Sequence, residues 1–241
     1  MYHQVQSLED AAAACLLLHR QGPPIVLVTS LELPTTPLGS NGDASSSAAA
    51  VEVGGEGNLV MIGSCATKRW AAHQVSDVTA FSSTAPSHGN GRGGEREDEE
   101  EVCVWALTVP KLDGAYTGTG DLTSALFLAF LTPPEDEVGG DTRATAATTA
   151  AETAVAAVPT ALRNVAGGVA AVLARTLAES GQGVELRLVQ SKREIESPNP
   201  EAFGIGQPVQ LPSDLVARAR LRVQQVQQKR DELVERERKG W

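Results

Sequence analysis

The residues best suited to chemistry form one short block, Gly118-Thr119-Gly120-Asp121, which directly precedes an apolar segment at 122–131. Glycines let the backbone turn sharply and come close to a ligand. If the apolar segment is a helix, the N–H groups at its start attract anionic oxygens. A carboxylate beside those groups can accept the proton of an attacking hydroxyl. The block therefore suits the transfer of a phosphoryl group to an alcohol, because N–H donors stabilise the charge developing on the phosphoryl oxygens.

A structural interpretation of the same block stays open. A Gly-x-Gly-Asp sequence is common before helices, and Asp121 could simply cap the helix by accepting a backbone N–H. The four residues alone do not separate this role from catalysis.

The segments that must position the block alternate between helix and strand. Ser7 and the acids after it predict a capped helix that ends at Gly22. Four segments have the composition of strands: 25–28, 58–63, 102–109 and 184–189. The first is wholly apolar, which predicts burial on both faces, and the last alternates cleanly, as an edge strand does. The order predicts an α/β fold with helices covering a sheet.

Three further helices are expected. One covers 122–131, and a long one runs from Glu152 to about Glu179, interrupted near Pro159 and near Gly167-Gly168. The last spans 213–239. Its apolar stripe is short: Leu215, Val216, Ala219, Val223, Val226 and Leu233. We interpret this charged helix as a solvated terminal helix, and a coiled-coil pairing is the alternative.

Low-complexity stretches interrupt the ordered segments. We predict disordered insertions at 35–56, 76–101 and 135–150, which are rich in Ser, Gly, Ala, Thr or acidic residues. Residues 201–241 are predicted to form a linker and the charged helix, separate from the main part at 1–200.

Composition and charge exclude several classes of function. The formal net charge of −10 argues against binding nucleic acid, which requires clustered basic residues. The three cysteines are far apart and lack zinc-site spacing, so we expect reduced thiols. We find no secretory signal and no uninterrupted apolar run that would span a membrane, so the expected compartment is the cytoplasm, with no membrane partner.

Four separated blocks resemble eukaryotic-type pyridoxal kinases, in the same order along the chain. They are 25–34, 58–64, 112–122 and 184–195. The GTGD block is shared with the broader ribokinase-like superfamily. The last block, with its LRLVQSKREI core, is more specific to pyridoxal kinases.

The resemblance implies a fold and an activity. The fold is a ribokinase-like three-layer α/β/α sandwich, incomplete on its N-terminal side, of which residues 1–200 form the C-terminal part. The activity is ATP-dependent phosphorylation of the 5′-hydroxyl of pyridoxal, and of pyridoxine and pyridoxamine, giving pyridoxal 5′-phosphate for vitamin B6 salvage. The implied cofactors are ATP, Mg²⁺ and a monovalent cation, K⁺ or Na⁺, and family members are usually homodimers.

The resemblance also implies roles for individual residues. Asp121 corresponds to the catalytic base, and Thr117 and Asp121 to substrate-binding positions, although the family commonly has an apolar residue at position 117. The implied ATP-binding residues are Thr29, Ser30, Leu112, Asp113, Gly114, Gly118, Thr119 and Gly120. The monovalent cation is implied near Thr29.

Family members are usually longer at the N-terminus. The segments without a counterpart here supply the residues that hold the pyridoxal ring and the acids that place magnesium, so no metal site is identifiable in this chain. We therefore expect the isolated chain to be inactive or very weak.

Two other functions stay open. The first is a related kinase acting on a sugar or on hydroxymethylpyrimidine, which the GTGD block permits and the LRLVQSKREI block argues against. The second is a non-catalytic interaction protein derived from half of a kinase.

Overall fold

The structure is a computed structural model, and it describes residues 5–38, 51–67, 101–131, 146–180 and 185–240. A four-stranded sheet has the order β1-β4-β5-β6, with every neighbouring pair antiparallel. Its strands are β1 (Ile25–Leu31), β4 (Asn58–Ala66), β5 (Val102–Pro110) and β6 (Val209–Gln210). A separate two-stranded sheet pairs β2 (Thr36–Leu38) with β3 (Val51–Val53). The three strands predicted at 25–28, 58–63 and 102–109 are confirmed.

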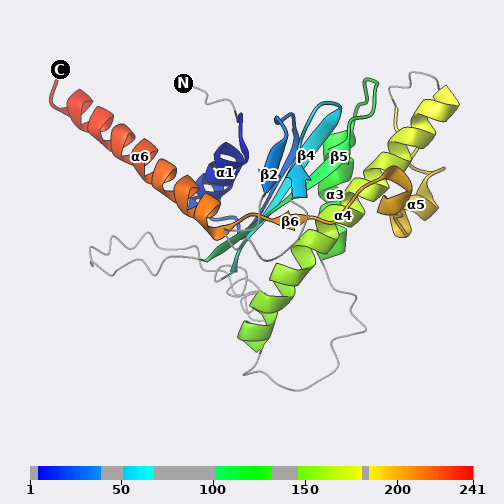
Figure 1. Cartoon of the computed structure of the whole chain (residues 1–241), viewed down its shortest axis with the longest axis horizontal. Helices are drawn as coiled ribbons and strands as arrows, with labels where there is room; N and C mark the ends of the chain where they lie inside the picture. Colours follow the sequence, from blue (N-terminus) through cyan, green and yellow to red (C-terminus); the bar gives the residue numbers. More distant parts are fainter. Residues whose placement is uncertain (1–4, 39–50, 68–100, 132–145, 181–184, 241) are drawn as a thin grey trace, which may run out of the picture.

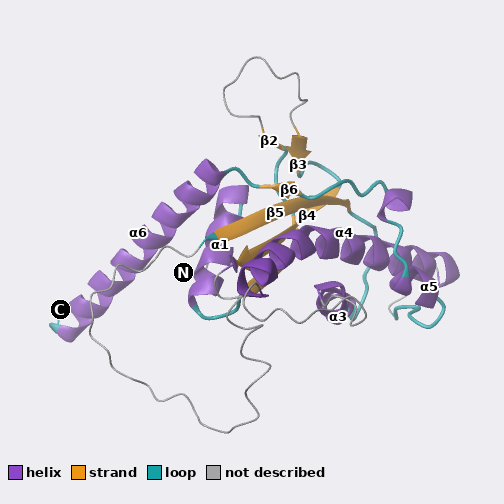
Figure 2. Ribbon diagram, turned by 90° about the horizontal axis from the view of Figure 1, so that it is seen from below, coloured by secondary structure: helices purple, strands orange, loops and turns teal. Residues whose placement is uncertain are grey.

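Helices cover both faces of the larger sheet. The helical segments are α1 (Leu8–Arg20), α3 (Thr119–Leu131), α4 (Ala146–Ser180), α5 (Lys192–Glu196), η2 (Pro200–Phe203) and α6 (Ser213–Arg238). In Figure 1, α6 and α1 lie on one side of the sheet and α3 and α4 on the other, and Figure 2 shows the same layers from below. The α/β class and the three-layer arrangement are therefore confirmed.

Two hydrophobic cores follow from the alternation of side chains along β4 and β5. Even-numbered residues such as Ile62 and Val104 pack in one core with α1 and α6. Odd-numbered residues such as Met61, Trp105 and Leu107 pack in the other core with α3 and α4. The sheet therefore separates the two cores, and α3 belongs to the second.

The first helix begins as the sequence predicts. The Ser7 side chain accepts a hydrogen bond from the Asp10 N–H at 3.1 Å, and Glu9 and Asp10 lie in the positive first turn. On the buried side of the helix, His19 is 2% exposed, and its Nε2 accepts from the Ser64 hydroxyl at 2.9 Å if Nδ1 carries the proton. That tautomer fits the Pro23 carbonyl, which lies 2.8 Å from Nδ1 and can only accept. These contacts fix α1 to β4.

The predicted interruptions of the long helix are wrong, because α4 runs unbroken from Ala146 to Ser180 with Pro159 inside it. Proline removes one helical N–H donor, but neighbouring Leu162 and Val165 are fully buried, and this packing outweighs the local loss. A Cβ at Gly167 would lie 2.8 Å from Pro200 Cγ. That glycine therefore permits close packing against η2 instead of ending the helix.

Residues Val155–Glu179 of α4 are long and apolar enough to cross a membrane by length and composition alone. Half of that window is buried inside the molecule, and core helices of soluble proteins have the same character.

The predicted edge strand at 184–189 is wrong for the residues that the structure describes, 185–189. Glu185 makes one isolated parallel bridge to Thr117, and the chain then turns, with the Leu188 N–H donating to the Leu186 carbonyl, before α5 begins. Leu188, on the apolar side of the alternation, is 42% exposed, so that side is not fully buried. The neighbouring position beside β5 in the sheet is held by β6 instead.

The predicted insertions fall largely outside the described residues, at 39–50, 68–100 and 132–145. The ends of the first insertion are ordered, because Thr36 pairs with Val53 and Leu38 with Val51 across β2 and β3. Residues 146–150 belong to α4. The boundary predicted at residue 200 stays a prediction.

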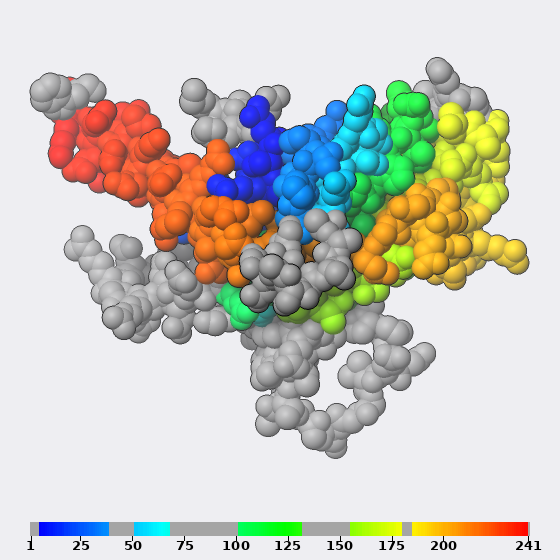
Figure 3. Space-filling model, viewed as in Figure 1, coloured from blue at the N-terminus to red at the C-terminus, as the bar shows by residue number. Residues whose placement is uncertain are grey.

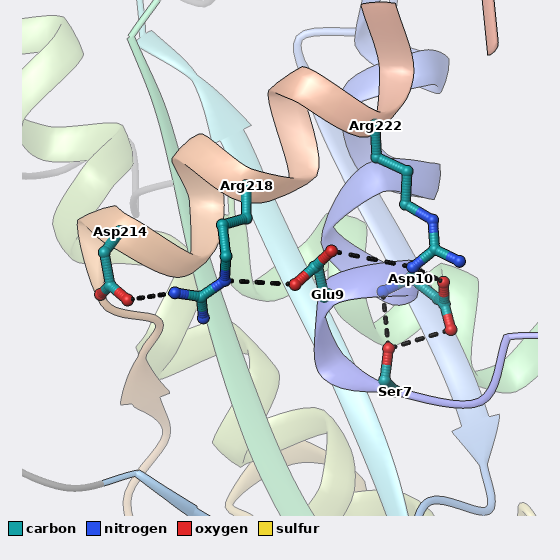
Figure 4. Close-up of polar contacts among 6 residues, drawn as sticks. All are labelled: Ser7, Glu9, Asp10, Asp214, Arg218 and Arg222. Carbon is teal, nitrogen blue, oxygen red and sulfur yellow. Dashed lines mark hydrogen bonds and ion pairs between the residues drawn. The ribbon is translucent and has the colours of Figure 1, made fainter. Parts of the chain in front are cut away.

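The terminal helix is confirmed, and its first half packs on α1. Arg222 Nη1 lies 2.6 Å from Asp10 Oδ1, and Arg218 bridges Asp214 at 2.6 Å and Glu9 at 3.2 Å (Figure 4). Beneath these ion pairs the first four residues of the apolar stripe are buried: Leu215, Val216, Ala219 and Val223. The second half of α6 extends away from the layers, as Figure 3 shows in orange to red, and Val226 and Leu233 are exposed.

Candidate active site

The Gly-Thr-Gly-Asp block lies where the chain enters α3. The Leu122 N–H donates to the Gly118 carbonyl at 3.0 Å, so the helix begins at Thr119 and Gly118 holds the capping position. Gly118 has φ 84°, in the left-handed region that favours glycine. Asp121 is three residues further on, so capping by Asp121 does not explain the block.

The carboxylate of Asp121 is exposed in the first turn of α3. Within the described parts of the chain, no hydrogen bond or ion pair engages it. A carboxylate near a helix N-terminus is stabilised by the helix dipole. Asp121 is therefore accessible to a ligand that approaches the start of α3.

A cavity of about 360 Å³ brings together most of the predicted nucleotide residues. Those that line it are Thr29, Ser30, Leu112, Gly114, Thr119 and Gly120. They come from the end of β1, the loop after β5 and the start of α3, which are far apart in the sequence. Asp113 and Gly118, predicted with them, do not line this cavity.

The strand end that borders the cavity has an unusual backbone. Ser30 has φ 61°, a rare conformation for a residue with a side chain. The pairing of β1 with β4 shifts register between Val28 and Leu31, so Ser30 lies in a bulge. Bulges commonly redirect side chains near functional sites, and this one places Thr29 and Ser30 at the cavity wall.

Much of the cavity wall is apolar, and the sequence analysis did not identify it. These residues include Met61, Val109, Val169, Leu173, Phe203 and Ile205. They come from β4, β5, α4 and the segment after α5, and their types are those of any core residue. The chain order gave no signal that they meet beside the Gly-Thr-Gly-Asp block.

Tyr116 is a further cavity residue that the sequence analysis missed. Its hydroxyl donates to the Asp113 carbonyl at 2.9 Å and closes the loop before the block. A Cβ on Gly114 would lie 2.7 Å from the Tyr116 ring, and Gly114 has φ 132°. Glycine at 114 is therefore required for this loop conformation.

A second cavity, of about 460 Å³, lies on the other side of the block. Thr117 and Asp121, the two predicted substrate-binding residues, both line it, together with Gly118. Its opposite wall comes from the turn after the bridge at Glu185, through Leu186 and Leu188. The region predicted as an edge strand thus faces Asp121.

The block forms a partition between the two cavities. Thr119 and Gly120 border the first cavity, and Gly118 and Asp121 border the second. A phosphate donor in one cavity and an acceptor alcohol in the other would meet at the start of α3. This geometry matches what transfer between two bound molecules requires.

Metal ligands are not assembled here. Among the described residues, no group of three or more His, Cys, Asp or Glu side chains could hold a metal ion. Divalent magnesium is bound through carboxylates and phosphates, so the side chains present do not by themselves fit a magnesium site.

Comparison with known proteins finds similarity to pyridoxal kinases. No family model matches the chain. The pyridoxal kinase of Sus scrofa is 27% identical over 195 residues, covering 81% of this chain and 44% of the relative. The chain therefore spans less than half the length of the curated relative that it matches.

Solved structures of the same name also align. A pyridoxal kinase from Leishmania donovani, in complex with ADP and pyridoxamine, has a TM-score of 0.47 and 17% identity, over 86% of this chain and 45% of that one. The pyridoxal kinase from Trypanosoma brucei has a TM-score of 0.42 and 18% identity, over 85% of this chain and 46% of that one. The sequence, over most of its length, resembles part of a pyridoxal kinase.

Proposed function

We propose that the protein carrying this chain is a kinase that transfers the terminal phosphoryl group of ATP to the 5′-hydroxyl of pyridoxal. Pyridoxine and pyridoxamine are the proposed related substrates, and pyridoxal 5′-phosphate is the product from pyridoxal. One observation carries the proposal: the Gly-Thr-Gly-Asp block borders both cavities, with Asp121 on one side and Gly120 on the other. The sequence similarity to a pyridoxal kinase supports the choice of substrate.

The first cavity, lined by Thr29, Ser30 and Gly120, suits the nucleotide. Its apolar wall offers a surface for the base, and Thr29 and Ser30 offer hydroxyl groups to ribose or phosphate. The N–H groups at the start of α3 face the phosphates and stabilise charge as the phosphoryl group moves. Glycine at 120 leaves this backbone open, because no atom lies within 4 Å of a Cβ placed there.

The second cavity suits the alcohol. A hydroxyl held beside Asp121 gives its proton to the carboxylate as its oxygen attacks the phosphorus. Leu186 and Leu188 provide an apolar wall against which a substrate ring can pack. This assigns Asp121 as the general base and Thr117 as a neighbouring contact.

Magnesium and a monovalent cation near Thr29 belong to the proposal only through the resemblance. Because the described side chains do not form a magnesium site, we derive no step through a metal. We expect the 241-residue chain to bind ATP but to transfer phosphate weakly, since charge neutralisation by metal is a large part of such catalysis. Homodimerisation and a cytoplasmic location also stay predictions.

Replacement of Asp121 by Asn tests the assignment. We expect ATP affinity to be retained and phosphorylation of pyridoxal to fall by about 10²–10⁴-fold, the usual contribution of a general base. The matched control is Asp214→Asn, which alters a first-turn aspartate of another helix, far from both cavities. The assay follows pyridoxal 5′-phosphate formation in protein that includes any further segments of the natural polypeptide.

Equal losses in both variants, or full activity in Asp121→Asn, would refute the role of Asp121. Assays with ribose and hydroxymethylpyrimidine separate the proposal from a related kinase. A protein that binds no nucleotide at all would instead favour the non-catalytic interaction protein, for which the exposed end of α6 is the candidate surface.

A further inference from the structure

Two cysteines far apart in the sequence lie directly opposite each other in the sheet. Cys65 of β4 pairs with Cys103 of β5, in a register that is continuous over the whole length of the two strands. Directly opposed residues of an antiparallel pair point to the same face, so the two thiols are neighbours. Both strands place them on the face that packs against α3 and α4.

The hydrogen bonds at the ladder ends define the spacing of the pair. The Thr67 N–H donates to the Glu101 carbonyl, and the Lys111 N–H donates to the Gly57 carbonyl. Hydrogen-bonded pairs recur at every second residue, so Cys65 and Cys103 also form such a pair, with Cα atoms about 5.5 Å apart. Disulfides span Cα separations of about 4.4–6.8 Å. The Cα spacing is therefore within the disulfide range. The Cβ atoms of a hydrogen-bonded pair lie about 5.5 Å apart and must approach to about 4.5 Å, so bond formation requires a small local movement of β4 toward β5.

The two thiols differ in accessibility, and the third cysteine is separated from them. Cys65 is fully buried, whereas Cys103 is partly exposed. Cys15 is buried in the core on the other face of the sheet, so the sheet stands between it and the pair. An oxidant would therefore reach Cys103 first, and the nearest described thiol to resolve the product is Cys65.

We propose that Cys65 and Cys103 are a redox-active dithiol that low-molecular-weight disulfides oxidise to an intramolecular disulfide between β4 and β5. The Cys103 thiolate attacks one sulfur of the reagent, forming a mixed disulfide and releasing one thiol. The Cys65 sulfur then attacks Cys103 Sγ, the new S–S bond forms, and the second thiol leaves. The two protein protons end on the two released thiols, and the reagent takes both electrons.

The environment of Cys103 affects how fast its thiol is oxidised and not which disulfide forms. Burial, and then the negative charge of Glu101, raise the pKa of the Cys103 thiol. Only the thiolate is nucleophilic, so oxidation is slow near neutral pH and accelerates as pH rises. In reducing compartments, the disulfides that proteins form are usually transient ones that act in catalysis or in redox sensing.

The test is oxidation of the folded chain by excess glutathione disulfide, followed by thiol titration and peptide mapping. Wild type holds three cysteines, and we expect two thiols to be lost and a peptide joining Cys65 to Cys103 to appear. Dithiothreitol should restore both thiols. Cys15→Ala should form the same peptide, because that residue lies on the other face.

Cys103→Ser is the decisive variant, because its side chain is only partly buried and the substitution is nearly isosteric. We expect it to lose no thiol under native conditions. A stable glutathione adduct on Cys103 with Cys65 still reduced would overturn the proposal. So would cross-links that involve Cys15, or oxidation of wild type only after denaturation. None of these outcomes depends on the kinase assignment.

Discussion

Alanine in place of Gly120 tests whether phosphate binds at the start of α3, because the structure predicts opposite effects on stability and on binding. A Cβ at Gly120 meets no atom within 4 Å, and the residue is helical with no positive φ. Alanine exceeds glycine in helix propensity by about 0.8–1.0 kcal/mol. We therefore expect the free energy of unfolding to rise by up to that amount, or about 2–4 °C in Tm for a chain of this size.

The same methyl group projects into the space that the proposed nucleotide cavity leaves beside Gly120. A phosphate that contacts this backbone would be displaced and would lose at least one charge-assisted hydrogen bond, worth about 1.5–3 kcal/mol. That loss corresponds to a Kd for ATP about 10- to 100-fold weaker. Calorimetric titration of wild type and Gly120→Ala with ATP measures it, beside thermal unfolding of both proteins.

The matched control is Gly118→Ala, two residues earlier. Gly118 has φ 84°, and the left-handed conformation costs a residue with a side chain about 1–2 kcal/mol, so this variant should unfold at a lower temperature. Unchanged ATP affinity in Gly120→Ala would refute phosphate binding at this helix start. Wild type that binds no ATP would refute the nucleotide cavity itself.

Two further predictions concern stability. Burial raises the pKa of the Cys15 thiol from 9.0 to about 11. The folded state therefore favours the neutral thiol, so stability is intact below pH 9.0 and falls by about 2–3 kcal/mol as pH rises to about 11. Urea unfolding should show a larger fall in wild type than in Cys15→Ala, which keeps the contribution of Cys103; equal falls in both would contradict the prediction. Gly167→Ala should cost about 1–3 kcal/mol, because its Cβ would lie 2.8 Å from Pro200, and a neutral result would show that η2 moves freely away from α4.

Local signals in the sequence correctly predicted the elements whose conformation depends mainly on their own residues. Ser7 and the following acids fixed the start of α1, and the block at Gly118 fixed the start of α3. Long-range packing decided the others. Gly167 suggested a helix break because the sequence does not show its contact with Pro200, which lies far along the chain. The alternation at 184–189 suggested a strand, but a strand also requires a paired neighbour and a buried side, and Leu188, on the apolar side of the alternation, is exposed.

The candidate site also contains both residues that local sequence signals predicted and residues that only long-range packing brings together. The polar and glycine residues at its centre were predicted because their types are unusual at such spacing, whereas Phe203 and Ile205 were not, because apolar residues are found in every core. The antiparallel sheet order also needed the structure, since β6 joins β5 from almost a hundred residues away along the chain.

The cavities and the second core share one face of the sheet, and this constrains how the site can be altered. Met61 and Val109 line the proposed nucleotide cavity and point to the same side as Trp105 and Leu107, which pack against α3 and α4. Packing on this face therefore positions the helix start that carries Asp121. The opposite face, which carries Ile62, contacts α1 and α6 and no part of either cavity. Substitutions there should change stability and leave nucleotide affinity intact, whereas substitutions beside Met61 should change both.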